Sequence, residues 1–430
     1  MWNHHSIDEV SKSRFSDVFC KPLYESYCFS RIPATIKYLL TGEGGQTLPK
    51  DCFHVQEDGY DMVVLLLLDA FGWTFFEKRA LQYPFLSRFV QKGIVSKITT
   101  QFPSTTAAHV TTINVGQEVG QTGVYEWFYY EPKVDQIIAP LMFSIAGAKT
   151  LGNIEKLGIT PKDIFPDTTF YLDLKKQGID SYLVQPENII HSAYSKAMSL
   201  GAHPISYYRL EEGLKTVVEA MRGSATTKSY FMMYFPDIDA AGHRHGIESK
   251  EFDEVIDGCM QTLEQFFIDS LNASNKKVAL LVTADHGMVP VDPKNTYFIN
   301  KQIPQITSLI KRNKQGLLLA PAGSCRDLFF HFNEESIDEG LSLLKEHLEG
   351  VAECYRVSEL IDLGFFGKAP VSEEFLSRVG NVVVLPFKGQ AVWWYEKGKF
   401  EQHFYGAHGG LTRDEAESIF LFQEIGPANV

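Results

Sequence analysis

Short apolar runs, each followed by polar residues, set the pattern of this chain. The runs 62–68, 230–235 and 278–282 are apolar or aromatic at every position, without the alternation of a strand that has one face in water. Continuous runs of this length indicate strands buried on both faces, as in a parallel sheet. Runs rich in apolar and β-branched residues predict further strands at 94–100, 181–184 and 381–385.

Longer amphipathic segments separate these runs, and in them apolar residues recur at the spacing of a helix. They predict helices at 30–40, 73–82, 107–115, 209–222, 252–272 and 336–349. Strands that alternate with helices indicate an α/β fold with a mainly parallel central sheet covered on both faces. We expect residues 1–45 to form an N-terminal helical extension and 46–430 a single domain, with a small cap or insertion within about 130–210.

Composition narrows the class of protein and of partner. The chain has 430 residues, 44% of them hydrophobic, and a net charge of −13. This charge argues against binding of a nucleic-acid duplex through a broad basic face, but not against a small anionic substrate, because bound metal ions reverse the local field. Six scattered cysteines form no closely spaced pair, and we interpret them as reduced, buried thiols.

Targeting signals are lacking in the sequence. No apolar stretch approaches the ~18 residues that span a bilayer, and the first residues contain no basic segment followed by an apolar one. A cytoplasmic location is therefore expected, although export by a signal-independent route would leave no trace in the sequence.

Acidic residues follow the three apolar runs. Asp69 comes after the first run, Asp237 and Asp239 after the second, and Asp285 after the third. In open α/β sheets, ligands bind beyond the carboxyl ends of the strands. The chain is therefore expected to bring distant carboxylates to one edge of one sheet.

Histidines accompany these carboxylates. His243 lies four residues after Asp239, His286 directly follows Asp285, and His408 stands in a glycine-rich loop. Any one such pair is weak as a signal, but their joint occurrence indicates a metal site. Oxygen and imidazole ligands without thiolates favour zinc, manganese or iron over calcium.

A group of hydroxyls lies between the first and second carboxylate. The segment 103–106, Pro-Ser-Thr-Thr, precedes a helix. Ser and Thr are common helix caps, and a helix N-terminus also attracts phosphate through its free N–H groups. A hydroxyl bound to a metal ion becomes a strong nucleophile.

The set of motifs resembles the alkaline phosphatase superfamily and, within it, the type I phosphodiesterase/nucleotide pyrophosphatase family. The resemblance extends over about 60–415 and consists of five motifs in the family's order. It implies an alkaline phosphatase-like, three-layer α/β/α fold. It also implies a hydrolase that cleaves phosphodiester or nucleotide pyrophosphate bonds in a small phosphorylated substrate such as a nucleotide.

The resemblance assigns each motif a role. Thr106 matches the nucleophile, and the implied cofactor is a pair of divalent metal ions, zinc in the first place, with manganese or iron as alternatives. The residues matched to ligands of one ion are Asp69, Thr106, Asp285 and His286, and those matched to ligands of the other are Asp239, His243 and His408.

The chain departs from the family pattern at several positions. His109 stands where the family usually has an asparagine, and the segment 123–127, Gly-Val-Tyr-Glu-Trp, lacks the amide that usually donates to a phosphoryl oxygen. Asp237 competes with Asp239, and the spacing to His243 favours Asp239. We interpret the aromatic residues Trp393, Trp394 and Phe404 as packing.

The same residues bear on four alternative functions. A phosphomonoesterase of the same fold agrees with the missing amide. A sulfatase lacks its C/S-x-P-x-R motif here, and a phosphoglycerate mutase relative would have a serine in place of Thr106. From a different class, a non-catalytic metal-binding scaffold is disfavoured because all expected ligand positions are filled. The sequence leaves the natural substrate and the oligomeric state open.

Overall fold

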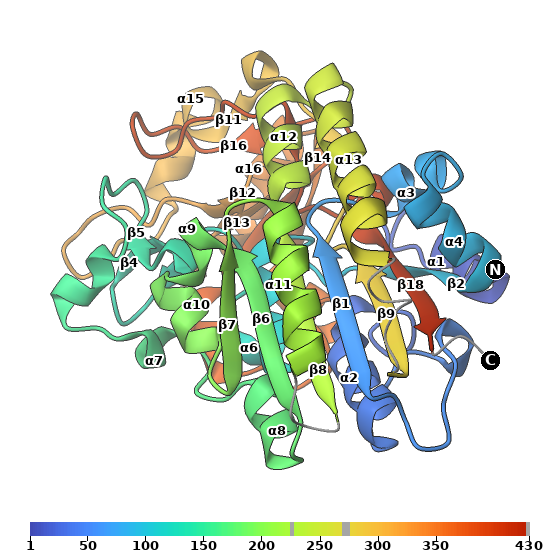
Figure 1. Ribbon diagram of the computed structural model, residues 1–430. Coiled ribbons are helices and arrows are strands. Elements are labelled where there is room, and N and C mark those ends of the chain that lie inside the picture. Colours follow the sequence, from blue (N-terminus) through green and yellow to red (C-terminus); the bar gives the residue numbers. More distant parts are fainter. Residues whose placement is uncertain (224–227, 269–275, 427–430) are drawn as a thin grey trace.

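The computed structural model describes residues 1–223, 228–268 and 276–426 (Figure 1). A sheet of seven strands runs through its centre. The strands are β1 (Met62–Leu68), β2 (Ile94–Thr99), β6 (Asp180–Pro186), β7 (Ala202–Tyr207), β8 (Ser229–Phe235), β9 (Val278–Thr283) and β18 (Glu417–Ile425). Their order is β2-β18-β9-β1-β8-β6-β7, and every neighbouring pair from β9 to β7 is parallel.

Strand β1 lies in the middle and is buried along its whole length. Its side chains alternate between two hydrophobic cores: Val63 and Leu65 belong to one, whereas Val64 and Leu66 belong to the other. Because both faces are apolar, the sequence of β1 shows no polar alternation. The continuous apolar runs of the sequence therefore correspond to central strands with a core on each side.

Helices cover both faces of the sheet. The core on one face includes residues of α2 (Ile32–Thr41), α5 (Thr106–Val115), α8 (Phe170–Lys176) and α10 (Ala193–Met198). The core on the other face includes residues of α3 (Trp73–Arg79), α4 (Pro84–Lys92), α11 (Leu210–Gly223), α12 (Asp237–His245) and α13 (Lys250–Leu263). The α/β fold with a mainly parallel central sheet is thus confirmed.

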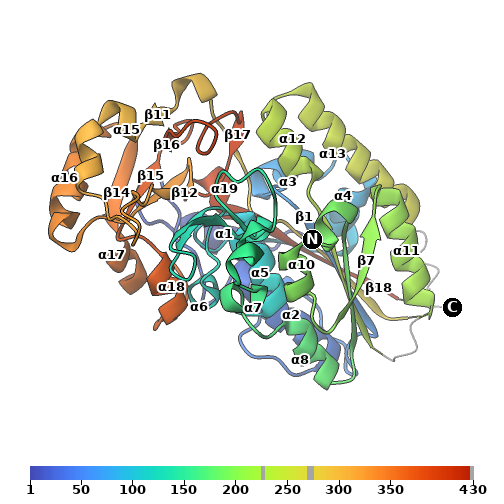
Figure 2. The same ribbon diagram turned by 90° about the vertical axis from the view of Figure 1, so that its left-hand side faces the viewer.

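A second, antiparallel sheet lies beside the first, at the left of Figure 2. Its strands are β12 (Ala322–Ser324), β13 (Asp327–Phe330), β15 (Val382–Pro386) and β14 (Ala352–Arg356), in that order. Helix α16 (Ile337–His347) packs against it, and the sheet has a hydrophobic core of its own. The predicted strand at 381–385 therefore exists, but in this sheet.

Short elements complete the fold. The pairs β10 (Val289–Pro290) with β17 (Gly406–Ala407) and β11 (Tyr297–Phe298) with β16 (Val392–Trp393) form two-stranded ribbons. Strands β3 (Tyr129–Glu131), β4 (Gln136–Ala139) and β5 (Ser144–Ile145) form a small sheet. The remaining α-helices are α1 (His4–Lys12), α6 (Val119–Thr122), α7 (Pro161–Ile164), α9 (Glu187–Ile190), α15 (Ile299–Gln302), α17 (Val357–Asp362), α18 (Glu373–Arg378) and α19 (Arg413–Ala416).

Some predictions differ from the structure in extent. Within 130–210, β6 and β7 belong to the central sheet, so only the earlier part of this region lies outside it. The helix predicted at 252–272 ends as α13 at Leu263 and continues as a π-helical turn over Glu264–Ile268, and its last predicted residues lie outside the described ones. The division into residues 1–45 and 46–430 stays a prediction.

Candidate metal centre and active site

The first group of candidate ligands forms where β1 and β9 end. Asp69, Asp285 and His286 are fully buried, and their ligand atoms lie within 4.8 Å of one another. His286 Nε2 lies 3.4 Å from both Asp69 Oδ1 and Asp285 Oδ2. Thr106 Oγ1 adjoins the group, 3.1 Å from His286 Nε2 and 3.5 Å from Asp69 Oδ1.

A second group consists of Asp239, His243 and His408. Asp239 Oδ1 lies 3.3 Å from His243 Nε2 and 3.5 Å from His408 Nε2. Asp239 and His243 are one turn apart on α12, so their side chains share one face of the helix. Asp237, at the start of the same helix, is exposed and does not belong to the group.

The two groups adjoin one another. The rings of His286 and His408 stack with their centroids 3.6 Å apart and their planes at 14°. All seven residues that the sequence singled out, Asp69, Thr106, Asp239, His243, Asp285, His286 and His408, therefore lie at one edge of the central sheet.

The three imidazoles are oriented alike. Each Nδ1 faces a backbone carbonyl: that of Gly406 at 2.8 Å for His243, Gly287 at 2.9 Å for His286, and Ser104 at 3.1 Å for His408. A carbonyl only accepts, so Nδ1 carries the hydrogen. Each Nε2 then presents a lone pair to its group, the orientation of a histidine that binds a metal ion.

Imidazole nitrogens and carboxylate oxygens lie close together in both groups. His243 Nε2 lies 3.2 Å from His408 Nε2, two acceptors face to face. The buried oxygens Asp239 Oδ1 and Asp285 Oδ2 have no hydrogen-bond partner among the described residues. Burial raises the pKa of Asp239 to about 6 and lowers that of His408, so the imidazole is neutral. A divalent cation in each group would supply the missing charge, and the donor sets fit one.

Thr106 is the first residue of α5, and Thr105 is its N-cap. Thr106 is 8% exposed, which makes it the most exposed residue of α5. The other residues of this helix are more deeply buried. The first backbone N–H groups of a helix have no partner within it, and they favour a negative charge. The Thr106 hydroxyl therefore stands where a phosphate group would meet both backbone donors and the first group of ligands.

His109 has a structural role in this loop. Its Nε2 accepts a hydrogen bond from the Gln101 N–H at 2.9 Å, and its Nδ1 donates to the Thr105 carbonyl at 2.7 Å. Burial lowers the pKa of His109 to about 4, which keeps the ring neutral. The histidine that replaces the family's asparagine thus connects the end of β2 to the start of α5.

Two neighbours of the ligands were not predicted. The Tyr234 hydroxyl donates to Asp69 Oδ2 at 2.5 Å, and Tyr234 gave no signal because its run is aromatic throughout. Phe404 was interpreted as packing, which is wrong: its side chain is 47% exposed, and its ring lies 4.5 Å from that of His243. Trp393 and Trp394 are buried, as packing requires.

Glu126 and Asp327 form a buried carboxyl pair close to Thr105. Both are fully buried, and Glu126 Oε1, Asp327 Oδ2 and Thr105 Oγ1 have no hydrogen-bond partner among the described residues. Burial raises the pKa of Glu126 to about 8. Burial, and then the charge of Glu126, raise the pKa of Asp327. The pair therefore keeps at least one proton at neutral pH, in the segment where the family's amide is missing.

This pair predicts a pH dependence of stability. Between the ordinary pKa of 4.5 and the folded value of about 8, the folded state holds a proton on Glu126 that the unfolded state has released. The free energy of unfolding should therefore fall as the pH rises through this window. In Glu126→Gln this contribution disappears, so the difference in Tm between variant and wild type should shift in favour of the variant from pH 5 to pH 8.

Exposed Glu43→Gln serves as the control, since its Tm should follow that of the wild type at every pH. Parallel Tm profiles for wild type and Glu126→Gln would contradict a shared proton on the pair.

Comparison with known proteins identifies the family of this chain. Residues 63–411 match the family model of the type I phosphodiesterase/nucleotide pyrophosphatases. The chain belongs to this family. The match includes the two ligand groups and Thr106, and it confirms the resemblance that the sequence motifs indicated.

One relative of this family member is distant in sequence. Ectonucleotide pyrophosphatase/phosphodiesterase family member 7 of Rattus norvegicus is 20% identical over 289 residues, which cover 64% of this chain and 62% of that protein. The match thus spans less than two thirds of the relative's length.

Solved structures share the fold. Murine ectonucleotide pyrophosphatase/phosphodiesterase 5, an inactive form in complex with AMP, superposes with a TM-score of 0.63 at 16% identity over 85% of this chain and 88% of that one. Phosphonoacetate hydrolase from Sinorhizobium meliloti 1021 superposes with a TM-score of 0.57 at 16% identity, over 84% of this chain and 89% of that one.

Among the described residues of this family member, no helix is both long and apolar enough to cross a bilayer.

Proposed function

We propose that the protein is a metal-dependent hydrolase that cleaves phosphodiester or nucleotide pyrophosphate bonds, with Thr106 as nucleophile and two divalent cations, zinc in the first place, as cofactors. One observation supports this most: Thr106 Oγ1 lies 3.1 Å from His286 Nε2, at the N-terminus of α5 and at the edge of a buried ligand group. A hydroxyl with a merely capping role has no need of such neighbours.

Each cation would have its own set of ligands. Asp69, Thr106, Asp285 and His286 would hold one cation, and Asp239, His243 and His408 the other. Such cations lower the pKa of a bound hydroxyl and offset the charge on the phosphoryl and leaving oxygens.

The reaction consists of two displacements at phosphorus, and Thr106 is the nucleophile of the first and the leaving group of the second. Its oxygen attacks phosphorus, the bond from phosphorus to the leaving oxygen breaks, and the leaving group departs with the electron pair and gains the proton that Thr106 lost. Water then attacks the phosphothreonine, which releases the phosphate product and restores the hydroxyl. Tyr234 keeps Asp69 in place throughout, because its hydroxyl donates to the oxygen of Asp69 that faces away from Thr106.

Substrate class follows from the family and from the groups beside the ligands. Phe404 presents an exposed ring next to His243, which suits a substrate with a flat aromatic part such as a nucleotide. The AMP complex of the murine relative agrees with this choice.

A phosphomonoesterase is the second candidate function. The segment 123–127 supplies no amide donor, and Glu126 is buried together with Asp327. Turnover of p-nitrophenyl phosphate, bis(p-nitrophenyl) phosphate and a panel of nucleotides distinguishes the two. A preference for the diester and for nucleotides supports the proposed function, a preference for the monoester supports the second candidate, and bound metal without turnover of any ester supports a scaffold.

Metal removal gives a prediction of its own. Chelation should abolish turnover and lower the Tm, because the buried Asp69 and Asp285 and the half-buried Asp239 are left without a counter-charge. At a free zinc concentration of about 1,000 Kd, binding adds about 4 kcal/mol to the free energy of unfolding. Addition of zinc to the chelated protein should restore both quantities. A Tm that is the same with and without zinc would exclude the two cation sites.

A further inference from the structure

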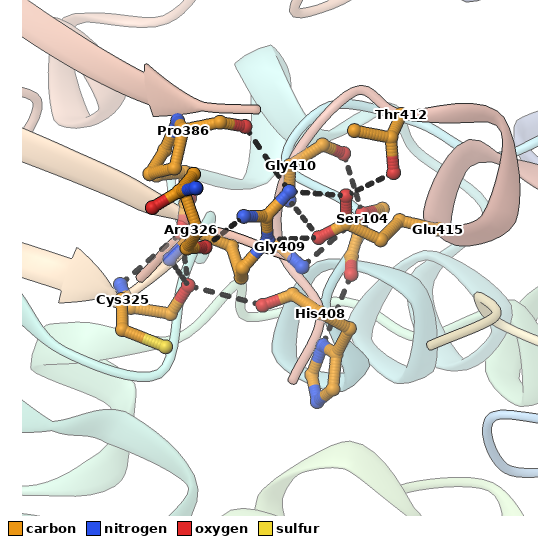
Figure 3. Close-up of polar contacts among 12 residues, drawn as sticks. Ser104, Cys325, Arg326, Pro386, His408, Gly409, Gly410, Thr412 and Glu415 are labelled. Carbon is orange, nitrogen blue, oxygen red and sulfur yellow. Dashed lines mark hydrogen bonds and ion pairs between the residues drawn. The ribbon is translucent and has the colours of Figure 1, made fainter. Parts of the chain in front are cut away.

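Arg326 and Glu415 form an ion pair that solvent does not reach, shown in Figure 3. Arg326 Nε lies 2.9 Å from Glu415 Oε1, and Arg326 Nη2 lies 3.0 Å from Glu415 Oε2, so the contact is bidentate. Arg326 lies in the tight turn between β12 and β13, and Glu415 lies in α19. The pair thus joins the second sheet to the segment that leads into the central one.

The remaining donors of Arg326 are bound as well. Nη1 donates to the carbonyls of Phe387, at 2.9 Å, and Gln390, and Nη2 donates to the carbonyl of Pro386 at 3.1 Å. A guanidinium with all these bonds cannot rotate, and its planar fork fixes the carboxylate of Glu415 in turn.

Glu415 passes this rigidity to the loop of His408. Its Oε1 accepts from the N–H of Gly410 at 3.1 Å, and its Oε2 accepts from the Thr412 hydroxyl at 2.5 Å. A Cβ on Gly410 would lie 3.0 Å from Oε2, so the backbone approaches the carboxylate as closely as only glycine allows. The loop is thereby held two residues after His408.

Ser104 connects the same loop to the nucleophile segment. Its hydroxyl donates to the carbonyl of Gly410 at 2.7 Å and accepts from the N–H of Gly409 at 3.2 Å. Its carbonyl accepts from Nδ1 of His408 at 3.1 Å. In Figure 3 the His408 ring points away from the Arg326–Glu415 pair, with Ser104 between them.

We propose that Arg326 and Glu415 are positioning residues that fix His408 against Asp239 and His243, and so determine the affinity for the second cation. This inference rests on the proposed function, because it assigns the second group to a cation. Asp239 and His243 lie on α12, a separate element, and His243 meets the loop of His408 through the carbonyl of Gly406. His408 is therefore the ligand that is expected to move most.

A second buried pair in the chain allows a matched comparison. Arg378 Nε lies 2.8 Å from Glu131 Oε2, and both side chains are about as buried as Arg326 and Glu415. Arg378 also donates to two backbone carbonyls, those of Gly123 and Ile164. None of these partners adjoins a residue of the two ligand groups.

The test replaces each pair by apolar side chains of similar volume, Arg326→Met with Glu415→Leu and, as control, Arg378→Met with Glu131→Leu. Apolar replacement of a whole buried pair avoids an unpaired charge, which favours folding. Competitive titration of the metal-free proteins with zinc against a chelating dye gives the two affinities, and His408→Ala identifies the second. Tm, measured without metal, reports the fold.

We expect the Arg326/Glu415 variant to lose about 10- to 100-fold in affinity for the second zinc ion only, the usual effect of removing a residue that orients a ligand. The Arg378/Glu131 variant should keep both affinities. Glu415→Asp, which keeps the charge beside Arg326 but shortens its reach to Gly410 and Thr412, should lose second-ion affinity in the same direction and secures the test if the double variant does not fold.

Unchanged second-ion affinity in both the double variant and Glu415→Asp would overturn the inference, as would an equal loss in the Arg378/Glu131 control. A wild-type chain that binds fewer than two zinc ions is a different result, because it overturns the proposed function itself.

Discussion

Thr106→Ala should lower turnover of the preferred ester by about 1,000-fold or more, the scale seen when a catalytic nucleophile is removed. The loss is expected because, among the described residues, Thr106 is the one whose hydroxyl hydrogen-bonds to His286 Nε2, at 3.1 Å. The variant should also fail to retain phosphate covalently after acid quenching of a reaction with ³²P-labelled substrate, whereas wild type retains it. Its Tm in the presence of zinc should stay close to that of wild type.

Thr105→Val is the matched control. Thr105 precedes the nucleophile, is fully buried, and its hydroxyl has no hydrogen-bond partner among the described residues. It should therefore keep turnover within a few-fold of wild type. If Thr106→Ala retained activity while Thr105→Val lost it, the nucleophile would be misassigned by one position; if both retained it, the covalent mechanism would be wrong.

Loss of one zinc ion but not of the other is the expected result for His408→Ala. The side chain contributes Nε2 to the group of Asp239 and His243, and the group of Asp285 does not include it. Removal of a residue that orients a ligand lowers metal affinity by about 10- to 100-fold. Removal of the ligand itself should lower the affinity by more. Zinc titration with mass-spectrometric metal analysis after dialysis measures the stoichiometry.

His331→Gln tests whether the effect is specific to the site. His331 directly follows β13 and is buried, and its ring packs against Tyr130 of β3, outside both ligand groups. This variant should keep two zinc ions per chain. Equal retention of both ions by His408→Ala, or loss of both, would show that the late histidine does not belong to the second group alone.

The carboxylates of the site were predictable from local sequence because each follows a fully apolar strand. Asp69 comes directly after β1 and Asp285 two residues after the end of β9, and the parallel register of these strands brings their ends together. His408 was different: it follows no such strand, and only the family resemblance assigned it to the site. Its place depends on the ribbon of β10 with β17 and on Ser104, contacts that no sequence spacing encodes.

The positioning residues could not be predicted for a related reason. Arg326 and Glu415 are 89 residues apart and are charged side chains that usually lie at the surface. Strand β18 was missed because only its middle, 419–422, is apolar, a run too short to separate strand from helix. The second sheet has strands of three to five residues interrupted by glycine and polar positions, which gave only β15 a clear pattern.

The placement of β18 has a consequence for biosynthesis. This strand pairs with both β2 and β9 in the interior of the sheet, although in the sequence it comes after all residues of the two ligand groups. During synthesis, the edges of β2 and β9 that pair with β18 stay unpaired until residue 425 has left the ribosome. Exposed edges of this kind template aggregation, so the nascent protein is expected to need a chaperone up to that point.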